Sequence, residues 1–213
     1  MTFGWMMLAV AVLAQDPPRT VWEQQYKERS AVAMAAQIES ASRPVFRYRV
    51  AIAGLLQLKP GMTAAEIGAG SGYLARVMAD QVGAAGRVIA TELEPKMVAY
   101  INERAKADKV ANLTAIQGTP VDSGLEPGSV DAIAVVNTFS FFEKPADLSR
   151  SIAAALKPGG LLLVVDFPRE GEGSTAVGID AHDVVKIVTA AGLARQDEIS
   201  LVTGEYAIRF RKR

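Results

Sequence analysis

A glycine-rich turn between two apolar segments constrains this chain more than any other feature. Residues 65–73 read AEIGAGSGY, so an apolar strand runs into a turn, and a helix is expected to follow over 73–82. A second apolar strand, residues 88–92, ends in Glu92, twenty residues after Gly72. Glycines let the backbone approach a ligand closely, and a carboxylate at the next strand's tip can accept two hydrogen bonds from a ribose diol. The pattern predicts a site for a nucleoside-like ligand.

The spacing of the glycines favours one kind of ligand over another. A dinucleotide-binding loop reads G-x-G-x-x-G, and counting from Gly68 its third glycine would fall at Tyr73. Here the spacing is G-x-G-x-G, with Gly72 one residue early. Glu66 lies two residues before the first glycine, where it would repel a phosphate and attract an ammonium group. A zwitterionic amino acid joined to a nucleoside is therefore favoured over a pyrophosphate.

These residues resemble motif I of the class I S-adenosylmethionine-dependent methyltransferases, and the resemblance continues along the chain. Glu92 matches the family's ribose-binding acidic residue. Residues 129–137 look like its fourth strand, residues 156–166 look like its L-K-P-G-G turn and fifth strand, and residues 58–62 are typical of the turn before its first strand. Together these motifs cover residues 45–213.

The resemblance implies S-adenosylmethionine as the cofactor and assigns roles at the carboxyl ends of the strands, where doubly wound sheets bind ligands. Glu66 would reach the ammonium, Glu92 the ribose hydroxyls and Leu93 the adenine ring, while Asn137 would lie near the methionyl group. The predicted cofactor-binding residues are Glu66, Gly68, Ala69, Gly70, Gly72, Tyr73, Glu92, Leu93, Gly118, Thr119 and Asn137.

The third strand departs from the family pattern. Many relatives carry Gly-Asp there, whereas this chain continues from Gln117 through Gly118 and Thr119. The Thr119 hydroxyl can accept a hydrogen bond but carries no full charge. Asp122 is an alternative if the turn folds back. We therefore expect this chain to bind the adenine more weakly than those relatives do, or through other residues.

No catalytic residue is identified. Methyl transfer needs a general base only if the acceptor holds its proton, and alignment of the reactants can supply much of the rate. His182, the single histidine, could act as a base, but it opens a helix and is expected to be solvated. Asp166 could face the acceptor or cap a loop. Pocket-lining and substrate-side candidates are Phe139, Phe141, Phe142, Tyr26, Arg43, Arg47 and Tyr48.

Composition excludes several classes of chemistry. The chain has no cysteine, so disulfides, thiol nucleophiles and cysteine-ligated metals are impossible. One histidine cannot build a multi-histidine metal site, and Asn137 stands where metal-dependent relatives of the catechol type place a carboxylate. An all-oxygen Mg²⁺ site stays possible in principle, but no metal is predicted. The 23 basic and 23 acidic residues give no net positive field, so a nucleic-acid partner is not supported and a small-molecule acceptor is expected.

The N-terminus carries a separate signal. Residues 3–14 are almost entirely apolar, too few to span a bilayer of about 30 Å as a helix, so no stable membrane span is expected. Their length, and the small Ala14, suit a secretory signal cleaved before Gln15, although no Lys or Arg precedes them. Residues 1–14 are thus a signal peptide or an apolar anchor. Export would give a periplasmic or secreted protein, and otherwise the protein is cytoplasmic.

The remaining chain divides into a linker with a covering helix, residues 15–44, and a methyltransferase domain, residues 45–213. A helix is expected over 21–40 and another from Pro44 to the Lys59-Pro60-Gly61 stop. Strands near 63–68, 87–92, 112–117, 130–136 and 160–166 alternate with helices near 72–82, 95–107, 145–156 and 180–191. A hairpin, 194–202 with 206–211, follows.

The fold expected from this order is a three-layer α-β-α sandwich. The resemblance gives a mostly parallel seven-stranded sheet of order 3-2-1-4-5-7-6 with strand 7 antiparallel. Two other functions are compatible with the sequence. One is a non-catalytic exported binding protein of the same fold; the other, disfavoured by Tyr73, is an NAD(P)-dependent reductase. The sequence indicates neither the acceptor atom nor the oligomeric state.

Overall fold

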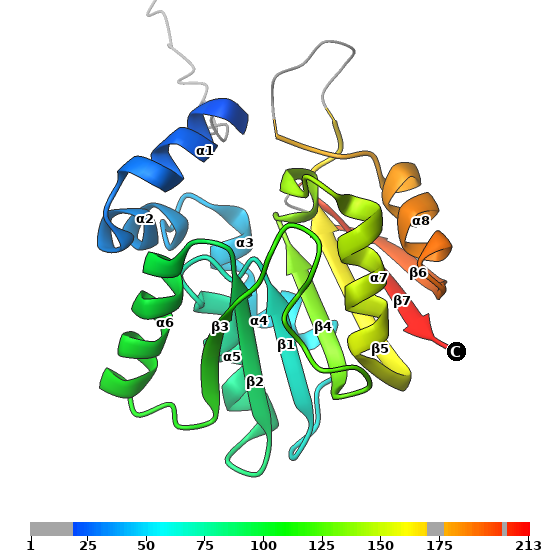
Figure 1. The fold of residues 1–213 in the computed structure, drawn as a ribbon, viewed down its shortest axis with the longest axis horizontal. Helices are drawn as coiled ribbons and strands as arrows, with labels where there is room; N and C mark the ends of the chain where they lie inside the picture. Colours follow the sequence, from blue (N-terminus) through cyan, green and yellow to red (C-terminus); the bar gives the residue numbers. More distant parts are fainter. Residues whose placement is uncertain (1–18, 170–176, 202–203) are drawn as a thin grey trace, which may run out of the picture.

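A seven-stranded sheet with helices on both faces forms the body of the protein (Figure 1). The computed structural model describes residues 19–169, 177–201 and 204–213. Strand order is β3-β2-β1-β4-β5-β7-β6, with β7 antiparallel to β5 and β6 and the other pairs parallel. The predicted fold class is confirmed. The apolar run at residues 3–14 and the glycine-rich loop at 171–174 lie outside the described residues, so export stays a prediction.

The strands and helices of the sheet domain fall close to the predicted ranges. The largest difference is at β5, which begins at Leu156 because this residue pairs with Val130 before an irregularity in the ladder. The strands are β1 (Thr63–Ile67), β2 (Arg87–Glu92), β3 (Leu113–Gln117), β4 (Val130–Val136), β5 (Leu156–Asp166), β6 (Leu193–Ser200) and β7 (Tyr206–Lys212). The helices between them are α5 (Tyr73–Val82), α6 (Pro95–Ala107), η1 (Phe139–Phe141), α7 (Pro145–Ala155) and α8 (Ala181–Ala190).

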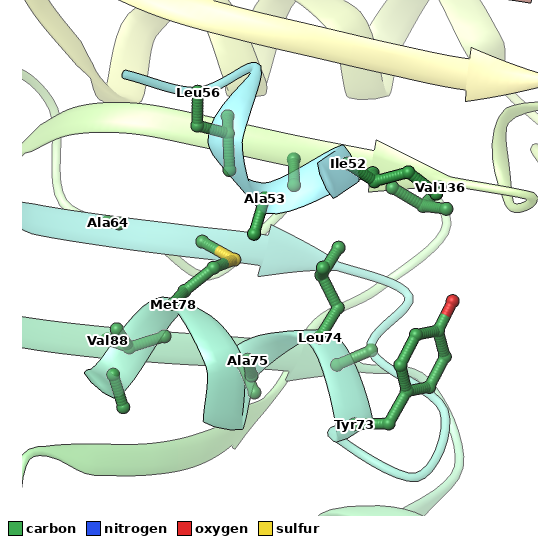
Figure 2. Close-up of a cluster of buried hydrophobic side chains, with 14 of the residues drawn as sticks. Ile52, Ala53, Leu56, Ala64, Tyr73, Leu74, Ala75, Met78, Val88 and Val136 are labelled. Carbon is green, nitrogen blue, oxygen red and sulfur yellow. The ribbon is translucent and has the colours of Figure 1, made fainter. Parts of the chain in front are cut away.

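Alternating side chains of the buried strands divide the core into two apolar layers. One layer packs β1, β2 and β4 against α4 and α5, as Figure 2 shows for Leu74 and Met78 of α5 beside Ala64 and Val88. The other layer packs the opposite faces of the same strands against α7 and α8. Small residues such as Ala64 let α5 approach the sheet closely, which fixes the helix N-terminus beside the strand tips.

The N-terminal helices differ from the prediction. A single helix over 21–40 is wrong, because the chain forms α1 (Arg19–Glu28) and α2 (Ala31–Ile38) with a break at Ser30. The Ser30 hydroxyl accepts from the Ala33 N–H at 3.2 Å and so caps α2. The expected second helix is also divided, into α3 (Pro44–Arg47) and α4 (Arg49–Gly54).

Two polar contacts hold these helices against the sheet domain. The Arg76 guanidinium of α5 pairs with the Glu39 carboxylate after α2, at 2.8 Å. The Lys96 ammonium of α6 donates to the carbonyls of Lys27 and Arg29 at 2.8 and 2.9 Å, at the end of α1. Cations suit the exposed carbonyls of a helix C-terminus. α1 therefore lies over the upper edge of the sheet (Figure 1).

Within the described residues, no helix combines the length and the apolar character needed to cross a bilayer.

We expect Leu163→Ala to destabilise the protein by about 2–5 kcal/mol, because it leaves a cavity under a side chain that is fully buried in a central strand. Val50→Ala, which truncates a side chain that is 61% exposed, serves as the control and should change stability by less than about 0.5 kcal/mol. Denaturant unfolding of both variants measures the difference. Equal effects would show that the packing described for β5 does not hold the domain together.

Candidate cofactor and acceptor site

A cavity of about 270 Å³ opens at the carboxyl ends of β1 to β4 beneath α1. Ligands of doubly wound sheets bind at this edge. Ten of the eleven predicted cofactor-binding residues line it. The exception is Gly72, where a Cβ would lie 3.1 Å from Ile101 of α6, so this glycine serves close packing of the helix rather than the cavity wall.

The glycine turn leaves no room for side chains. Gly68 and Gly70 have φ of 69° and 56°, conformations that L-residues rarely adopt. A Cβ on Gly68 would stand 2.1 Å from Thr138 Cγ2, and one on Gly70 would stand 3.2 Å from Ile38 Cδ1. Thr138 and Ile38 thus occupy the places that side chains on these two glycines would take, and the glycines line the cavity with their backbone.

Glu92 lies at the end of β2 and is 6% exposed. One carboxylate oxygen accepts from the Gly70 N–H at 2.9 Å and the other from the Leu93 N–H at 2.7 Å. The Tyr26 hydroxyl of α1 also donates to this carboxylate. Burial raises the pKa of Glu92, while these donors oppose the rise. The carboxylate thus joins the glycine turn, the strand tip and the covering helix.

Glu66 lies beneath the turn and is 2% exposed. Its carboxylate accepts from the Ala75 N–H at 2.9 Å, one of the free donors in the first turn of α5. A pyrophosphate would need those donors and the positive end of the helix dipole. Because the Glu66 carboxyl group already accepts from one of these donors, this helix N-terminus is less suited to a dinucleotide. Burial, with the nearby Glu92, raises the pKa of Glu66 to about 8.

At the β3 end of the cavity the chain folds back on itself. The Thr119 N–H donates to the Asp122 carbonyl at 2.7 Å, and the Thr119 hydroxyl accepts from the Asp122 N–H at 3.0 Å. The backbone N–H and the hydroxyl of Thr119 therefore both form hydrogen bonds within their own turn. Asp122 lines the cavity, as does Leu93, which is 47% exposed and offers an apolar surface to a flat ring.

Asn137 directly follows β4 and lines the same cavity. Its φ is 48°, and its backbone N–H donates to the Val165 carbonyl at 2.8 Å. Both polar atoms of its side-chain amide are buried and have no hydrogen-bond partner among the described residues. Phe141 and Phe142 continue the cavity wall past this residue.

Asp166 is a structural cap in this fold and does not line the cavity. It is fully buried and accepts from the Ser140 N–H at 3.0 Å, the Ser140 hydroxyl at 3.2 Å and the Phe167 N–H at 2.9 Å. Burial raises its pKa to about 6. These contacts fix η1 over the end of β5, which positions Phe141.

The remaining candidates divide between wall and surface. His182 is exposed near the start of α8, as the sequence predicts. Arg43 lines the cavity, with its guanidinium carbon 5.1 Å from the ring centroid of Trp22. Arg47 and Tyr48 are exposed and are not among the lining residues. Phe139 packs against Phe142, with ring centroids 4.8 Å apart, and belongs to the core.

Sequence reasoning missed Trp22 and Ile38 as wall residues and did not assign Tyr26 to Glu92. The apolar spacing of α1 and α2 indicated amphipathic helices but not what they cover. Across the described residues, no group of three or more His, Cys, Asp or Glu side chains could hold a metal ion.

Comparisons with known proteins agree with this geometry. The family model described as "Methyltransferase domain" matches residues 65–164, from within β1 to near the end of β5. A crystal structure of a SAM-dependent methyltransferase from Aquifex aeolicus superposes with a TM-score of 0.74 at 19% identity, covering 86% of this chain and 99% of that one. The two proteins thus share the Rossmann-like fold. Residues 65–164, just under half of the chain, match this methyltransferase-domain model, as the resemblance predicts.

Two curated relatives show similarity over part of their length. The protein-L-isoaspartate O-methyltransferase of Methanothrix thermoacetophila is 30% identical over 110 residues, which are 52% of this chain and 50% of that protein. The ubiquinone/menaquinone biosynthesis C-methyltransferase UbiE of Ectopseudomonas mendocina is 26% identical over 152 residues, 71% of this chain and 58% of that protein. The matched segments span 50% and 58% of the length of these two relatives.

The raised pKa of Glu66 predicts a pH-dependent stability. The folded protein keeps this proton up to about pH 8, whereas an unfolded glutamic acid loses it near pH 4.5, so the free energy of unfolding should fall as pH rises between these values. Glu66→Gln keeps an acceptor for the Ala75 N–H but cannot ionise. We expect this variant to lose less stability than the wild type between about pH 5.5 and about pH 8 in urea unfolding. Parallel curves would contradict the assignment.

Proposed function

We propose that this protein is an S-adenosylmethionine-dependent methyltransferase that acts on a small-molecule acceptor. The observation that carries the proposal is the buried Glu92 carboxylate at the end of β2, hydrogen-bonded to the Gly70 N–H of a turn with no space for side chains. A carboxylate in this position accepts from a ribose diol. The family match over residues 65–164 and the methyltransferase names of the relatives support the same activity.

The residues of the cavity fit each part of this cofactor. Glu92 would accept from the ribose hydroxyls, and the exposed Leu93 side chain would pack on the adenine ring. Glu66 would bind the ammonium group of the cofactor. This positive charge would favour the ionised form of the Glu66 carboxyl group, which burial disfavours in the unliganded protein. The bare backbone of Gly68 and Gly70 would admit the chain between the ribose and the amino acid. The Asp122 carboxylate at the β3 end is the acceptor available to the adenine amino group.

The bound cofactor would supply an electrophilic methyl group. The protein's part is to align this group with an acceptor and to keep water out of the cavity, because orientation can supply about 7–11 kcal/mol of a barrier in favourable cases. Phe141 and Phe142 give the far end of the cavity an apolar wall suited to a small organic molecule. Neither a basic surface nor a nucleic-acid fold motif is needed for such an acceptor.

We expect wild-type protein to bind S-adenosylhomocysteine in isothermal titration and Glu92→Ala to weaken that binding at least about tenfold, since each hydrogen bond to a charged group contributes about 1.5–3 kcal/mol. Glu126→Gln, an exposed carboxylate outside the cavity, controls for the change in net charge. No heat with wild-type protein at millimolar ligand would overturn the proposal. Binding of NADH in a fluorescence titration would favour the reductase instead.

We expect Tyr26→Phe to bind S-adenosylhomocysteine severalfold more tightly. A carboxylate has about four acceptor positions, and backbone donors together with the Tyr26 hydroxyl already use those of Glu92. The ribose hydroxyls must displace some of these donors, and the phenol on the covering helix is the most easily moved. Weaker binding by the variant would show that Tyr26 instead stays in contact with the bound nucleoside.

A non-catalytic binding protein of the same fold is the second candidate, favoured by the absence of an identified general base in the cavity. Incubation of the protein with a metabolite extract and methyl-labelled S-adenosylmethionine separates the two functions by mass spectrometry. A labelled product that depends on Glu92 supports the enzyme. Nucleoside binding with no labelled product from any extract would support the binding protein.

A further inference from the structure

Two buried carboxyl groups lie in the wall of the same cavity, on neighbouring strands. Glu66 is the last residue but one of β1 and is 2% exposed, and Glu92 ends β2 and is 6% exposed. Both side chains line the cavity, and the negative charge of Glu92 disfavours ionisation of Glu66. Two carboxyl groups that share a buried site are costly to ionise together, so one of them tends to keep its proton.

The hydrogen bonds around the two groups indicate which one keeps the proton. Glu92 accepts from three backbone N–H groups, at 2.7, 2.9 and 3.4 Å, and from the Tyr26 hydroxyl. Glu66 accepts from a single described donor, the N–H of Ala75 in the first turn of α5, at 2.9 Å (Figure 2). Donors stabilise the ionised form of a carboxyl group. Glu66 is therefore the group that keeps a proton in the unliganded protein.

No cation within the protein compensates the charge that Glu66 would carry. Among the described residues, no Lys or Arg nitrogen lies within 4.0 Å of its carboxyl oxygens. The Arg76 guanidinium of α5 favours the ionised form from a distance, but it pairs with Glu39 at 2.8 Å. Tyr26 of α1 and Tyr73 of α5 also face this carboxyl group, and burial raises the pKa of both phenols, so they stay uncharged. The residues opposite on β2 and β4 are alanines.

We propose that cofactor binding releases a proton from Glu66, so that the protein binds its cofactor more tightly as pH rises. The inference rests on the proposed function, because it concerns the ammonium end of the same site. The unliganded protein holds Glu66 as a neutral acid. The ligand ammonium brings the missing positive charge, the carboxyl proton passes to the solvent, and the carboxylate and the ammonium form an ion pair. When the ligand leaves, Glu66 takes up a proton again.

The direction and range of the pH effect follow from burial. Because burial raises the pKa of Glu66 to about 8, the free protein is protonated there below that pH, and protons compete with the ligand. The affinity for an ammonium-bearing nucleoside should then rise by up to about tenfold per pH unit on the acid side of pH 8 and level off above it. A nucleoside without an ammonium group leaves the proton in place. The protein would therefore distinguish the two ligands better at higher pH.

The number of protons released by two ligands gives the first test. We would titrate wild-type protein calorimetrically at about pH 6.5, where an α-amino group is still protonated, in phosphate and in imidazole buffer. The difference in heat between buffers of different ionisation enthalpy gives the protons released. We expect about one proton with S-adenosylhomocysteine and none with 5′-methylthioadenosine, which has the same nucleoside and sulfur but no amino acid. Equal numbers for the two ligands would overturn the proposal, because the proton would then belong to the nucleoside part of the site.

Variants give the second test. Glu66→Gln keeps an acceptor for the Ala75 N–H but has no proton to lose, so we expect no proton release. Its affinity for S-adenosylhomocysteine should change less than about twofold between pH 6 and pH 7.5, where that of wild type rises at least about tenfold. Glu143→Gln is the matched control, since it removes an exposed carboxylate from the same cavity wall and should keep the wild-type proton release. Release of one proton by Glu66→Gln would assign it to Glu92 and overturn the proposal.

The outcomes separate this inference from the proposed function. If wild-type protein fails to bind S-adenosylhomocysteine, the proposed function is overturned and the proton release with it. If the protein binds this ligand equally well at pH 6 and pH 7.5 and releases no proton, only the present inference is overturned. The comparison of the two ligands needs wild-type protein alone, so it decides the question even if Glu66→Gln fails to fold.

Discussion

The hydrogen bond between the Gly70 N–H and the Glu92 carboxylate is the contact on which the site depends. It joins the turn after β1 to the tip of β2, two segments that the parallel register already places side by side. A carboxylate buried to this degree is stable only with several donors around it. The backbone N–H groups of the turn and of Leu93 supply them, so the same groups that shape the cavity also keep its main recognition residue ionisable.

Much of the sheet domain could be predicted from sequence because its signals are local. Apolar runs ending in glycine or an acidic residue set the strands, and the order of motifs fixed the crossovers and the site edge. Gly68 illustrates the strength of this reasoning. A glycine at a strand–turn–helix junction indicates a position with no room for a side chain, and in the structure the Thr138 side chain occupies that room. Gly72 shows its limit, because the same pattern does not tell a ligand-facing glycine from one that packs under a helix.

The parts that sequence reasoning missed depend on contacts between distant segments. The break at Ser30 divides a continuous apolar pattern into α1 and α2, and a serine within such a pattern is compatible with either a cap or an exposed helical position. The contact of Tyr26 with Glu92 joins residues far apart in the chain. No pattern within either segment of the sequence predicts this contact. The folding back of the Thr119 turn was foreseen as one alternative, but only coordinates decide between it and an open loop.

β1 and β4 carry residues of the hydrophobic core along their length and polar residues of the site at their carboxyl ends. Along β1 and β4 most side chains are small or branched apolar groups and are buried. The residues at or just past the strand tips differ: Glu66 carries a carboxyl group whose pKa is raised to about 8, and Asn137 carries an amide with no described partner. Each is unfavourable in the unliganded fold. A ligand ammonium would restore the charge of Glu66, so part of the binding free energy would come from relief of this cost. Groups held in unfavourable states need rigid neighbours. The two apolar layers supply them, because one contains the buried residues of α5 and the other contains Phe139 of η1.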